Sequence, residues 1–340
     1  MTAVVHRVLV AGTGESFACA ADDTLLRAAQ RAGLGFPYEC NVGSCGNCRF
    51  ELVDGALENA WPEAPALSEK DRARGRHLGC QSMPRGDCTI KLRPQARYAP
   101  VQRPQRTGAS LLRRRALTHD IEEFVFELDA AQGFEPGQYA LVQLPGVAGP
   151  RAYSMSNVAG DGRRWEFQVR KLSGGVGSVA LFALAPGARV AIDGPYGMAW
   201  LRRTSPRDIV CIAGGSGLAP MVSILRGAVA EPQLAGRRLD LVYGGRTVAD
   251  LCGRDLLMAL PGWGERLHYH PVVSAQPAGE PVPAGVETGF AHESAQRRFG
   301  ERLRECEVYF AGPPAMTEAV QRMLLEAGVP PDQHHFDQFY

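Results

Sequence analysis

The chain has 340 residues, and its 37 lysines and arginines nearly balance 36 aspartates and glutamates. A chain of this length exceeds one ordinary hydrophobic core, so we expect two or three domains. A near-zero net charge without a long basic run gives nucleic-acid binding no electrostatic support, and no apolar stretch reaches membrane-spanning length or resembles a secretory signal. We therefore expect a cytoplasmic protein, and a monomer.

The first domain is expected at residues 1–96 and combines a small sheet with one main helix. The helix in ADDTLLRAAQRAG can begin at Asp23 or Thr24 and end at Gly33, because short polar side chains cap helix N-termini and glycine ends helices. Alternation and turn residues predict a ferredoxin-like β-grasp sheet, with strands at 3–10, 49–52 and 89–92, a short strand after the turn at 12–15, and a second helix in SEKDRARG.

Four cysteines of this domain have the spacing C-x4-C-x2-C-x31-C, which is the plant-type pattern for a [2Fe–2S] cluster. Two tetrahedral irons need four thiolates, of which a tight loop can supply three and a distant segment the fourth. Gly43 and Gly46 let the loop fold closely and direct backbone N–H groups at the inorganic sulfides. The predicted cluster ligands are Cys40, Cys45, Cys48 and Cys80.

Other interpretations of the cysteines have less support. Zinc sites favour paired C-x2-C knuckles, and only one such pair is present. Disulfides are disfavoured because nine cysteines is an odd count and no signal peptide precedes the domain. Cys88 rivals Cys80 as the fourth ligand, but GDCTIKL alternates as a strand, so we expect a packed thiol there. The other cysteines are expected to be core or surface residues: Cys19, Cys211, Cys252 and Cys306.

Two further domains are expected after a linker at residues 97–106, where the sequence is rich in Pro, Gln and Arg and has no periodicity. Residues 107–203 contain short strands with Gly/Pro turns, which predict an antiparallel β-barrel: IEEFVFELD, GQYALVQLP, RRWEFQVRKL and ARVAIDGPYG. In residues 204–340 strands alternate with helices, which indicates a doubly wound parallel α/β sheet that binds a nucleotide.

The barrel carries two motifs that suit a flavin. In RAYSMSN, Arg151 can pair with a pyrophosphate, the ring of Tyr153 can lie along the isoalloxazine, and the hydroxyl of Ser154 can reach a ring nitrogen. A glycine loop before a helix can hold the pyrophosphate with backbone N–H groups. Each motif alone is an ordinary strand end or a flexible loop, but the two together are more specific. The further candidate FAD contacts are Val169, Gly174, Gly175, Val176, Gly177 and Ser178.

Glycine turns at successive strand ends of the last domain suit a pyridine nucleotide. The turn AGGSGLAPM follows a hydrophobic strand and opens a helix, but it is neither the G-x-G-x-x-G form nor a P-loop. The next strand ends at YGGR, where the adenosine ribose would be bound, and another ends at AGPPAM. The candidate contacts in these turns are Gly214, Gly215, Ser216, Gly217, Arg246, Gly312 and Pro313.

These motifs resemble those of the ferredoxin–NADP reductase superfamily. The added N-terminal domain resembles the cluster domain of one-chain reductases of bacterial oxygenases. FPYECN, WPEAP, IAGGSGLAPMVS and HFDQFY are similar to the reductase components of toluene-4-monooxygenase-like multicomponent aromatic monooxygenases, over essentially the whole chain. The resemblance implies that Ser154 lies near the reactive flavin nitrogen and is a catalytic candidate, as is Tyr340. It also implies that a C-terminal aromatic covers the isoalloxazine, with Phe336, Phe339 and Tyr340 left open.

One position departs from the pattern of the family. A cysteine usually precedes Gly-Pro in the last glycine turn, and Ala311 stands there instead. The family cysteine is thought to help position the nicotinamide, so hydride transfer is the step that this change would affect. The overall reaction is not in question, because the chemistry belongs to the flavin.

The resemblance implies an NADH-dependent reductase that passes electrons from NADH to FAD, then to the [2Fe–2S] cluster and an external acceptor. The expected acceptor is a Rieske-type ferredoxin or the oxygenase component of an aromatic monooxygenase. The alternatives are a reductase that serves a Rieske dioxygenase or a haem-thiolate monooxygenase, and a non-catalytic redox sensor with the same cofactors. A sensor would carry an extra effector or DNA-binding segment, and none is visible in the sequence.

Overall fold

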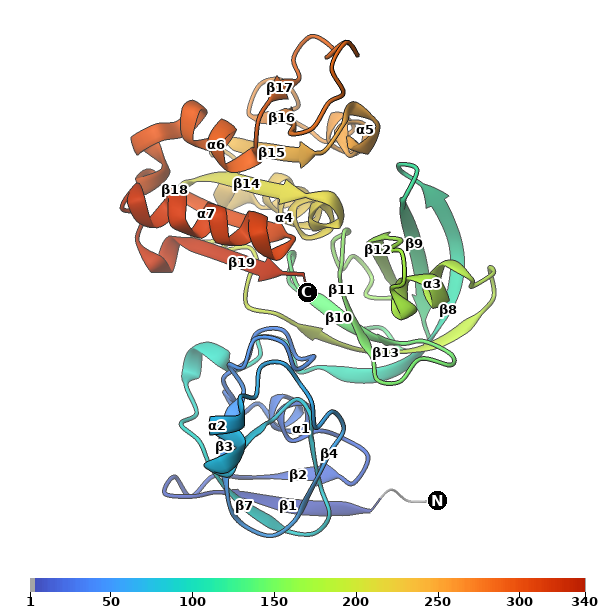
Figure 1. Cartoon of the computed structure of the whole chain (residues 1–340), viewed down its shortest axis with the longest axis vertical. Coiled ribbons are helices and arrows are strands. Elements are labelled where there is room, and N and C mark those ends of the chain that lie inside the picture. Colours follow the sequence, from blue (N-terminus) through green and yellow to red (C-terminus); the bar gives the residue numbers. More distant parts are fainter. Residues whose placement is uncertain (1–3, 340) are drawn as a thin grey trace.

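The computed structural model describes residues 4–339 and folds them into three sheet-based domains that follow one another along the long axis of the molecule (Figure 1). The N-terminal sheet lies at one end, an antiparallel sheet lies in the middle, and a parallel sheet with helices lies at the other end. The last strand, β19 (His334–Gln338), points from the parallel sheet back to the region where the three domains meet. The predicted combination of fold classes is confirmed.

The N-terminal domain is a five-stranded sheet in the order β2-β1-β7-β3-β5. Strands β1 and β7 pair in parallel at its centre, and the other neighbours are antiparallel. A two-stranded ribbon of β4 and β6 flanks this sheet. The elements are β1 (Val5–Val10), β2 (Ser16–Ala20), α1 (Leu25–Ala32), β3 (Arg49–Asp54), β4 (Leu57–Asn59), α2 (Glu69–Ala73), β5 (Arg76–Leu78), β6 (Ser82–Pro84) and β7 (Cys88–Lys91).

Helix α1 packs on this sheet because one side of it is apolar: Leu25 and Leu26 are fully buried. Thr24 occupies the N-cap position, but its side chain makes no capping hydrogen bond. The helix ends at Gly33, whose φ of 88° is the left-handed conformation that glycine adopts without strain. The helix therefore leads directly into the loop that contains Cys40, Cys45 and Cys48, which we call the cysteine loop.

The segment predicted as a linker is held against its neighbours. It contains a short 3-10 turn, η1 (Ala96–Tyr98), and the backbone N–H of Gln95 donates to the carbonyl of Gly35. The buried Gln30 donates to the carbonyl of Tyr98 at 3.0 Å. Strand β8 already begins at Gln105, inside the expected linker. The side chain that fixes this segment lies far away in the sequence, so local composition does not reveal the contact. The domain boundaries themselves stay predictions.

The middle domain is a six-stranded antiparallel sheet in the order β11-β10-β13-β8-β9-β12. A bridge between Met155 and Phe167 joins its two edges, so the sheet nearly closes into a barrel around a core that contains Phe124, Phe126 and Trp165. The elements are β8 (Gln105–Ala116), β9 (Ile121–Leu128), β10 (Tyr139–Gln143), β11 (Arg151–Ser154), β12 (Arg164–Arg170), α3 (Val176–Phe182) and β13 (Arg189–Tyr196).

The C-terminal domain is a parallel sheet in the order β17-β16-β15-β14-β18-β19. Alternate residues of β14 point to opposite faces: Cys211 joins the core under α4, and Ile212 joins the core under α6 and α7. Among residues 4–339, no helix has both the length and the apolar character needed to cross a membrane. The elements are β14 (Asp208–Gly214), α4 (Leu218–Ala230), β15 (Leu239–Gly245), α5 (Arg254–Met258), β16 (Leu267–Val273), β17 (Glu287–Thr288), α6 (Ala291–Phe299), β18 (Cys306–Gly312), α7 (Pro314–Glu326) and β19; the remaining 3-10 turns are η2 (Gly215–Gly217), η3 (Pro232–Leu234), η4 (Val248–Asp250), η5 (Gly300–Glu305) and η6 (Pro331–Gln333).

The N-terminal and middle domains share one core. Tyr139, Leu141 and Tyr196 of the barrel belong to the hydrophobic cluster of the N-terminal domain. At the same boundary Arg31 pairs with Asp193 at 2.6 Å. Because buried aromatic contacts and a partly buried ion pair cross the boundary together, the two domains are packed as one unit.

The middle and C-terminal domains meet through α4. Ser223 donates to the carbonyl of Asn157 at 2.6 Å and accepts from the backbone N–H of Gly137 at 3.2 Å. Arg226 donates to the carbonyl of Ser156 and also contacts Glu166 at 3.2 Å. These contacts fix the glycine turn at the start of α4 relative to the barrel wall.

Candidate functional site

The four predicted ligand cysteines lie close together: three are in the cysteine loop, and Cys80 reaches it from a separate segment. The Sγ atoms of Cys48 and Cys80 are 3.4 Å apart, although the residues belong to different segments. The backbone N–H groups of Val42 and Cys45 point at the Sγ atom of Cys40, at 3.5 and 3.4 Å. The positive φ angles of Gly43 (92°) and Gly46 (79°) let the loop turn its amides inward.

The spacing of these sulfur atoms bears on which metal group fits. Within residues 4–339, no three of the four sulfurs lie within 4.8 Å of one another. A tetrahedral zinc ion with four thiolates would bring them all to about 3.8 Å, given Zn–S bonds near 2.3 Å. The wider arrangement with inward N–H donors suits a two-iron group, whose sulfides accept such hydrogen bonds. The donor set therefore fits a [2Fe–2S] cluster.

Cys88 stands apart from this group. It lies on the central strand β7, in register with Val8 of β1. Burial, and then the charges of Asp87 and Asp54, raise the pKa of its thiol. It does not line the cavity described below, whereas Cys40 and Cys80 both do. The structure therefore supports the choice of Cys80 over Cys88 as the fourth ligand.

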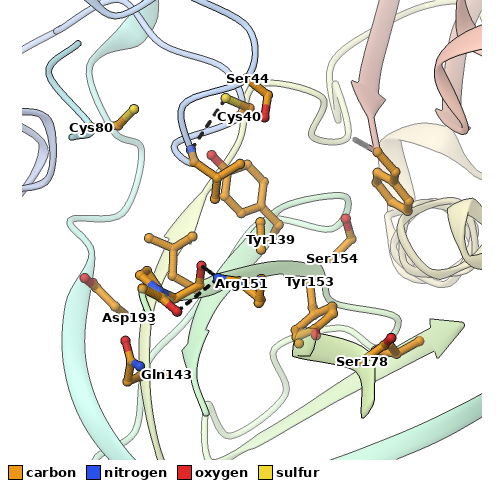
Figure 2. A pocket seen from close by; sticks show the side chains of 18 of the residues that line it. Cys40, Ser44, Cys80, Tyr139, Gln143, Arg151, Tyr153, Ser154, Ser178 and Asp193 are labelled. Atoms are coloured by element: carbon orange, nitrogen blue, oxygen red, sulfur yellow. Dashed lines mark hydrogen bonds between the residues drawn. The ribbon is translucent and has the colours of Figure 1, made fainter. Parts of the chain in front are cut away.

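A cavity of about 1190 Å³ opens where the three domains meet. Its walls include the cysteine loop, strands β10 to β12 of the barrel, the start of α3, the turn after β14 and the C-terminal segment. Figure 2 shows Cys40 and Cys80 at one side of this space and Arg151, Tyr153, Ser154 and Ser178 at another. A cavity of this size can hold a large elongated ligand against the barrel and leave it open to the cysteine loop and to the α/β domain.

The barrel side contains most of the expected flavin contacts. Arg151 lies across the start of α3, and its guanidinium donates to the carbonyl of Ala148 at 3.0 Å. A Cβ atom on Gly177 would lie 2.7 Å from Cγ of Arg151, so this glycine makes room for the arginine. The cavity is lined by Arg151, Tyr153, Ser154, Val169, Gly175, Val176, Gly177 and Ser178, and Gly174 is not among the lining residues.

Gln168 is a contact that the sequence reasoning missed. It is buried and lines the cavity, and neither its amide oxygen nor its amide nitrogen has a partner within residues 4–339. A buried amide without partners is costly, so this residue calls for a ligand with a donor and an acceptor. The polar edge of an isoalloxazine ring offers both, and the cavity therefore fits FAD. The only signal in the sequence was a glutamine between two apolar residues in RRWEFQVRKL.

The α/β side brings the glycine turns to the same cavity. Gly214, Gly215 and Ser216 line it, and so does Pro313. Gly217 does not; a Cβ atom there would lie 2.1 Å from the carbonyl oxygen of Ala311, so this glycine allows two turns to pack together. Gly312 also lies outside the lining set.

Arg246 lies at the end of β15, outside the cavity, and is exposed. The carboxylate of Asp250, a possible partner for it, accepts instead from the backbone and side chain of Thr247, at 2.7 and 3.0 Å. Asp250 also faces Arg170 at 3.6 Å. The structure therefore does not show Arg246 paired with Asp250.

The C-terminal aromatics do not share one position. Phe336 stacks on Phe310 with ring centroids 5.1 Å apart, on the core face of β19, so it does not cover the cavity as the sequence had suggested. Successive side chains of a strand point to opposite faces, which turns its neighbour Asp337 to the cavity. Phe339 lines the cavity, and its backbone N–H donates to the carbonyl of Gly312 at 3.0 Å. Tyr340 lies outside the described residues.

Asp337 is the second residue that the sequence reasoning missed. Its carboxyl lines the cavity, is buried, and has one oxygen without a partner within residues 4–339. Burial, and then the charge of Glu39, raise the pKa of Asp337 to about 7. The only signal for it in the sequence was an acid between the aromatics of HFDQFY.

Comparisons with known proteins agree with this arrangement. Three family models match the chain: a 2Fe-2S iron-sulfur cluster binding domain at residues 8–85, an oxidoreductase FAD-binding domain at residues 108–200 and an oxidoreductase NAD-binding domain at residues 211–322. The three follow one another in the order of the three folded domains.

Full-length relatives have the same combination. The chain is 40% identical to the ferredoxin–NAD(+) reductase component of the alkene monooxygenase system of Xanthobacter autotrophicus, covering 96% of this chain and 98% of the relative. It is 38% identical to the ferredoxin–NAD(P)(+) reductase CarAd of Metapseudomonas resinovorans, over 95% and 96%. A solved ferredoxin reductase in carbazole 1,9a-dioxygenase covers 100% of both chains with a TM-score of 0.91 and 34% identity.

Proposed function

The chain belongs to the family of ferredoxin–NAD(P)+ reductase components that supply electrons to bacterial multicomponent oxygenases, and we propose that it is the NADH-dependent reductase of an aromatic monooxygenase system. Its work is electron transfer from a reduced pyridine nucleotide through FAD and a [2Fe–2S] cluster. The observation that carries the proposal is the single cavity shared by the glycine turns, the barrel wall and two of the ligand cysteines.

FAD, when bound, accepts two electrons as a hydride and releases them singly, which a one-electron iron–sulfur cluster can accept. The chain's own residues orient and enclose the reactants. Arg151 and the start of α3 provide the charge and the backbone donors for a pyrophosphate. Ser154 presents a hydroxyl to the cavity, and Gln168 offers both hydrogen-bonding groups of its buried amide.

The α/β side and the C-terminal segment form the opposite wall. Gly214, Gly215 and Ser216 leave room for a dinucleotide at the carboxyl end of β14, where open α/β sheets bind ligands. Of the C-terminal aromatics among the described residues, Phe339 is the one that lines the cavity, so we assign to it the cover over the flavin ring that a nicotinamide displaces. Ala311 is fully buried on β18, and its methyl group stands where the family has a thiol.

The preference for NADH over NADPH is part of the proposal. A 2′-phosphate needs several cationic or hydroxyl donors beyond the second strand of the sheet. Here Arg246 is the one cation of YGGRTVADL, and the acidic Asp250 follows four positions later in the sequence. The measurement is the ratio of kcat/KM for the two nucleotides at one salt concentration. A ratio in favour of NADPH would refute the preference, and Arg246→Ala would then test Arg246 as the phosphate ligand.

The oxygenase partner requires a separate test. The resemblance of FPYECN, WPEAP and HFDQFY favours a monooxygenase, and the full-length match to a reductase in carbazole 1,9a-dioxygenase favours a Rieske dioxygenase as the second candidate. Purified protein would be combined with the ferredoxin and oxygenase components of an aromatic monooxygenase or with those of a Rieske dioxygenase, and NADH-dependent product formation by each system would be measured. Faster turnover of the dioxygenase system would overturn the proposed partner and leave the reductase assignment intact.

The central experiment concerns the cofactors themselves. Purified protein is expected to contain one FAD per chain and about two irons and two acid-labile sulfides, as one [2Fe–2S] cluster requires. NADH should bleach the flavin absorbance and support cytochrome c reduction. Zinc at a comparable level without sulfide would contradict the proposal.

A further inference from the structure

A buried arginine contacts the cysteine loop. Arg27 lies in the first turn of α1, is only 8% exposed, and lines the cavity together with Cys40 and Cys80. Its guanidinium donates twice to Asn41, the residue that directly follows Cys40. Nε donates to the side-chain oxygen and Nη2 to the backbone carbonyl, each at 3.3 Å. Because both bonds go to one loop residue, the charged end of the arginine is fixed against the loop.

The same turn of α1 also contacts the segment of the fourth ligand. The backbone N–H of Leu26 donates to the carbonyl of Gly79, the residue before Cys80, at 3.0 Å. Two neighbouring residues of the helix therefore contact both segments that supply ligand cysteines, the loop through Arg27 and the other segment through Leu26. This arrangement brings the charge of Arg27 next to the place where a [2Fe–2S] cluster fits.

Arg27 has no acidic partner in the described part of the chain. Every hydrogen bond of its guanidinium there goes to Asn41, and no carboxylate lies within ion-pair distance. Arg31, one turn further along the helix, instead pairs with Asp23 at 2.9 Å and with Asp193 at 2.6 Å. A buried cation is costly unless a negative group faces it, and a cluster held by four thiolates is negatively charged.

The side chain of Asn41 also lacks a partner. This residue is 1% exposed, and its side-chain nitrogen makes no hydrogen bond within residues 4–339. Its side-chain oxygen is occupied by Arg27, so the arginine fixes the orientation of the amide. A buried donor without an acceptor is costly, and the sulfur atoms of a cluster accept hydrogen bonds. Asn41 therefore offers a donor directly after a ligand cysteine.

We propose that Arg27 is the buried counter-charge of the cluster and that, with the amide of Asn41 that it orients, it raises the reduction potential of the cluster. The inference rests on the proposed function and concerns its electron-transfer step. Reduction adds an electron to a group that is already negative, so a cation and a hydrogen-bond donor beside it stabilise the reduced form more than the oxidised form. Buried charges are screened little by salt, so the effect persists at physiological ionic strength.

The test is the midpoint potential of the cluster, measured on the purified holoprotein by a potentiometric titration followed by EPR. Arg27→Gln removes the charge and should lower the potential by about 59 mV, which is a tenfold change in the equilibrium constant for one electron. Arg27→Lys keeps the charge and should keep most of the potential. The matched control is Arg93→Gln, the same substitution at an exposed arginine of this domain whose side chain makes no hydrogen bond or ion pair in the described part of the chain. Its potential should not change, because water screens an exposed charge.

Asn41→Gly measures the contribution of the amide. Asn41 has a φ of 55°, which glycine adopts without strain, so the loop keeps its path while the donor is lost. The potential should fall although the charge of Arg27 remains.

Several results would overturn the proposal. One is an unchanged potential in both Arg27→Gln and Asn41→Gly, and another is an equal fall in Arg27→Gln and Arg27→Lys, which would exclude the charge as the cause. Loss of FAD from Arg27→Gln with an unchanged cluster potential would assign the arginine to the flavin. Loss of the cluster from Arg27→Gln, together with an unchanged potential in Asn41→Gly, would assign it to the fold alone.

Iron and acid-labile sulfide in the unmodified protein report the proposed function separately. Absence of the cluster there would count against that function. A cluster that is present, with a potential independent of Arg27, would count against the inference alone.

Discussion

Replacing Asp337 with asparagine should make the protein more stable at neutral pH. The native carboxyl is buried, with one oxygen lacking a partner within residues 4–339. Burial, and then the charge of Glu39, raise its pKa from 3.8 to about 7. An asparagine has nearly the shape of the protonated acid and cannot ionise, so it avoids the cost of a buried charge.

The size of the effect follows from the two pKa values. Below pH 3.8 the carboxyl is protonated in both the folded and the unfolded chain, so its contribution is fully present. As pH rises towards 7 the unfolded chain ionises while the folded chain stays protonated, and stability is lost. At 1.36 kcal/mol for each factor of ten, the full loss is about 4 kcal/mol, and about 2 kcal/mol of it falls between pH 5 and pH 7.

The assay is urea unfolding of the cofactor-loaded protein, followed by circular dichroism at pH 5, 6 and 7. The free energy of unfolding of Asp337→Asn should exceed that of the native protein by a margin that grows by about 2 kcal/mol over this range. Glu318→Gln, which removes an exposed acid from the same domain, controls for the loss of one negative charge. A margin that stays constant with pH would show that Asp337 is ionised in the fold and would refute the reasoning.

Three further predictions concern cofactor retention and transfer. Cys80→Ser should lose the cluster and abolish cytochrome c reduction while NADH still bleaches the flavin, and Cys88→Ser should keep the cluster. Iron and sulfide analysis of both variants measures this. Loss of the cluster in Cys88→Ser would reverse the ligand assignment. Arg151→Ala should release FAD on gel filtration, because it removes a charged contact to the pyrophosphate, whereas Ser154→Ala should slow flavin reduction in stopped-flow more than it weakens FAD retention; equal effects would support neither role. Phe339→Ala should change the flavin spectrum and the KM for NADH, and unchanged values would remove this ring from the flavin face.

The domain order was predictable because each domain has its own local signature. Alternating apolar residues, glycine turns and the C-x4-C-x2-C spacing are short-range patterns, and they indicated the β-grasp sheet, the barrel and the parallel sheet. The packing of Gln30 on the supposed linker depends on a contact between segments 68 residues apart. The sharing of Tyr139 with the N-terminal core is of the same kind. Local sequence carries no record of such pairings.

The candidate site shows the same limit. Motif residues such as Arg151 and Gly215 reached the cavity because glycine turns and strand ends direct them there. Gln168 and Asp337 have no motif, and only their buried polar atoms that lack a hydrogen-bond partner within residues 4–339 mark them. The choice between Phe336 and Phe339 depended on a final strand that the sequence had not suggested: Phe336 lies on the core face of β19, and Phe339 directly follows its end.

Because the first two domains share a core, electron transfer between the flavin site and the cluster site does not depend on the concentration of the protein. Tyr139, Leu141 and Tyr196 hold the cysteine loop against the cavity wall in every copy of the protein. A separate flavoprotein and ferredoxin would have to collide, and their exchange would slow on dilution, whereas two sites in one rigid unit face each other at a fixed effective concentration. A low concentration of the protein in the cell would then slow only its encounter with the external acceptor.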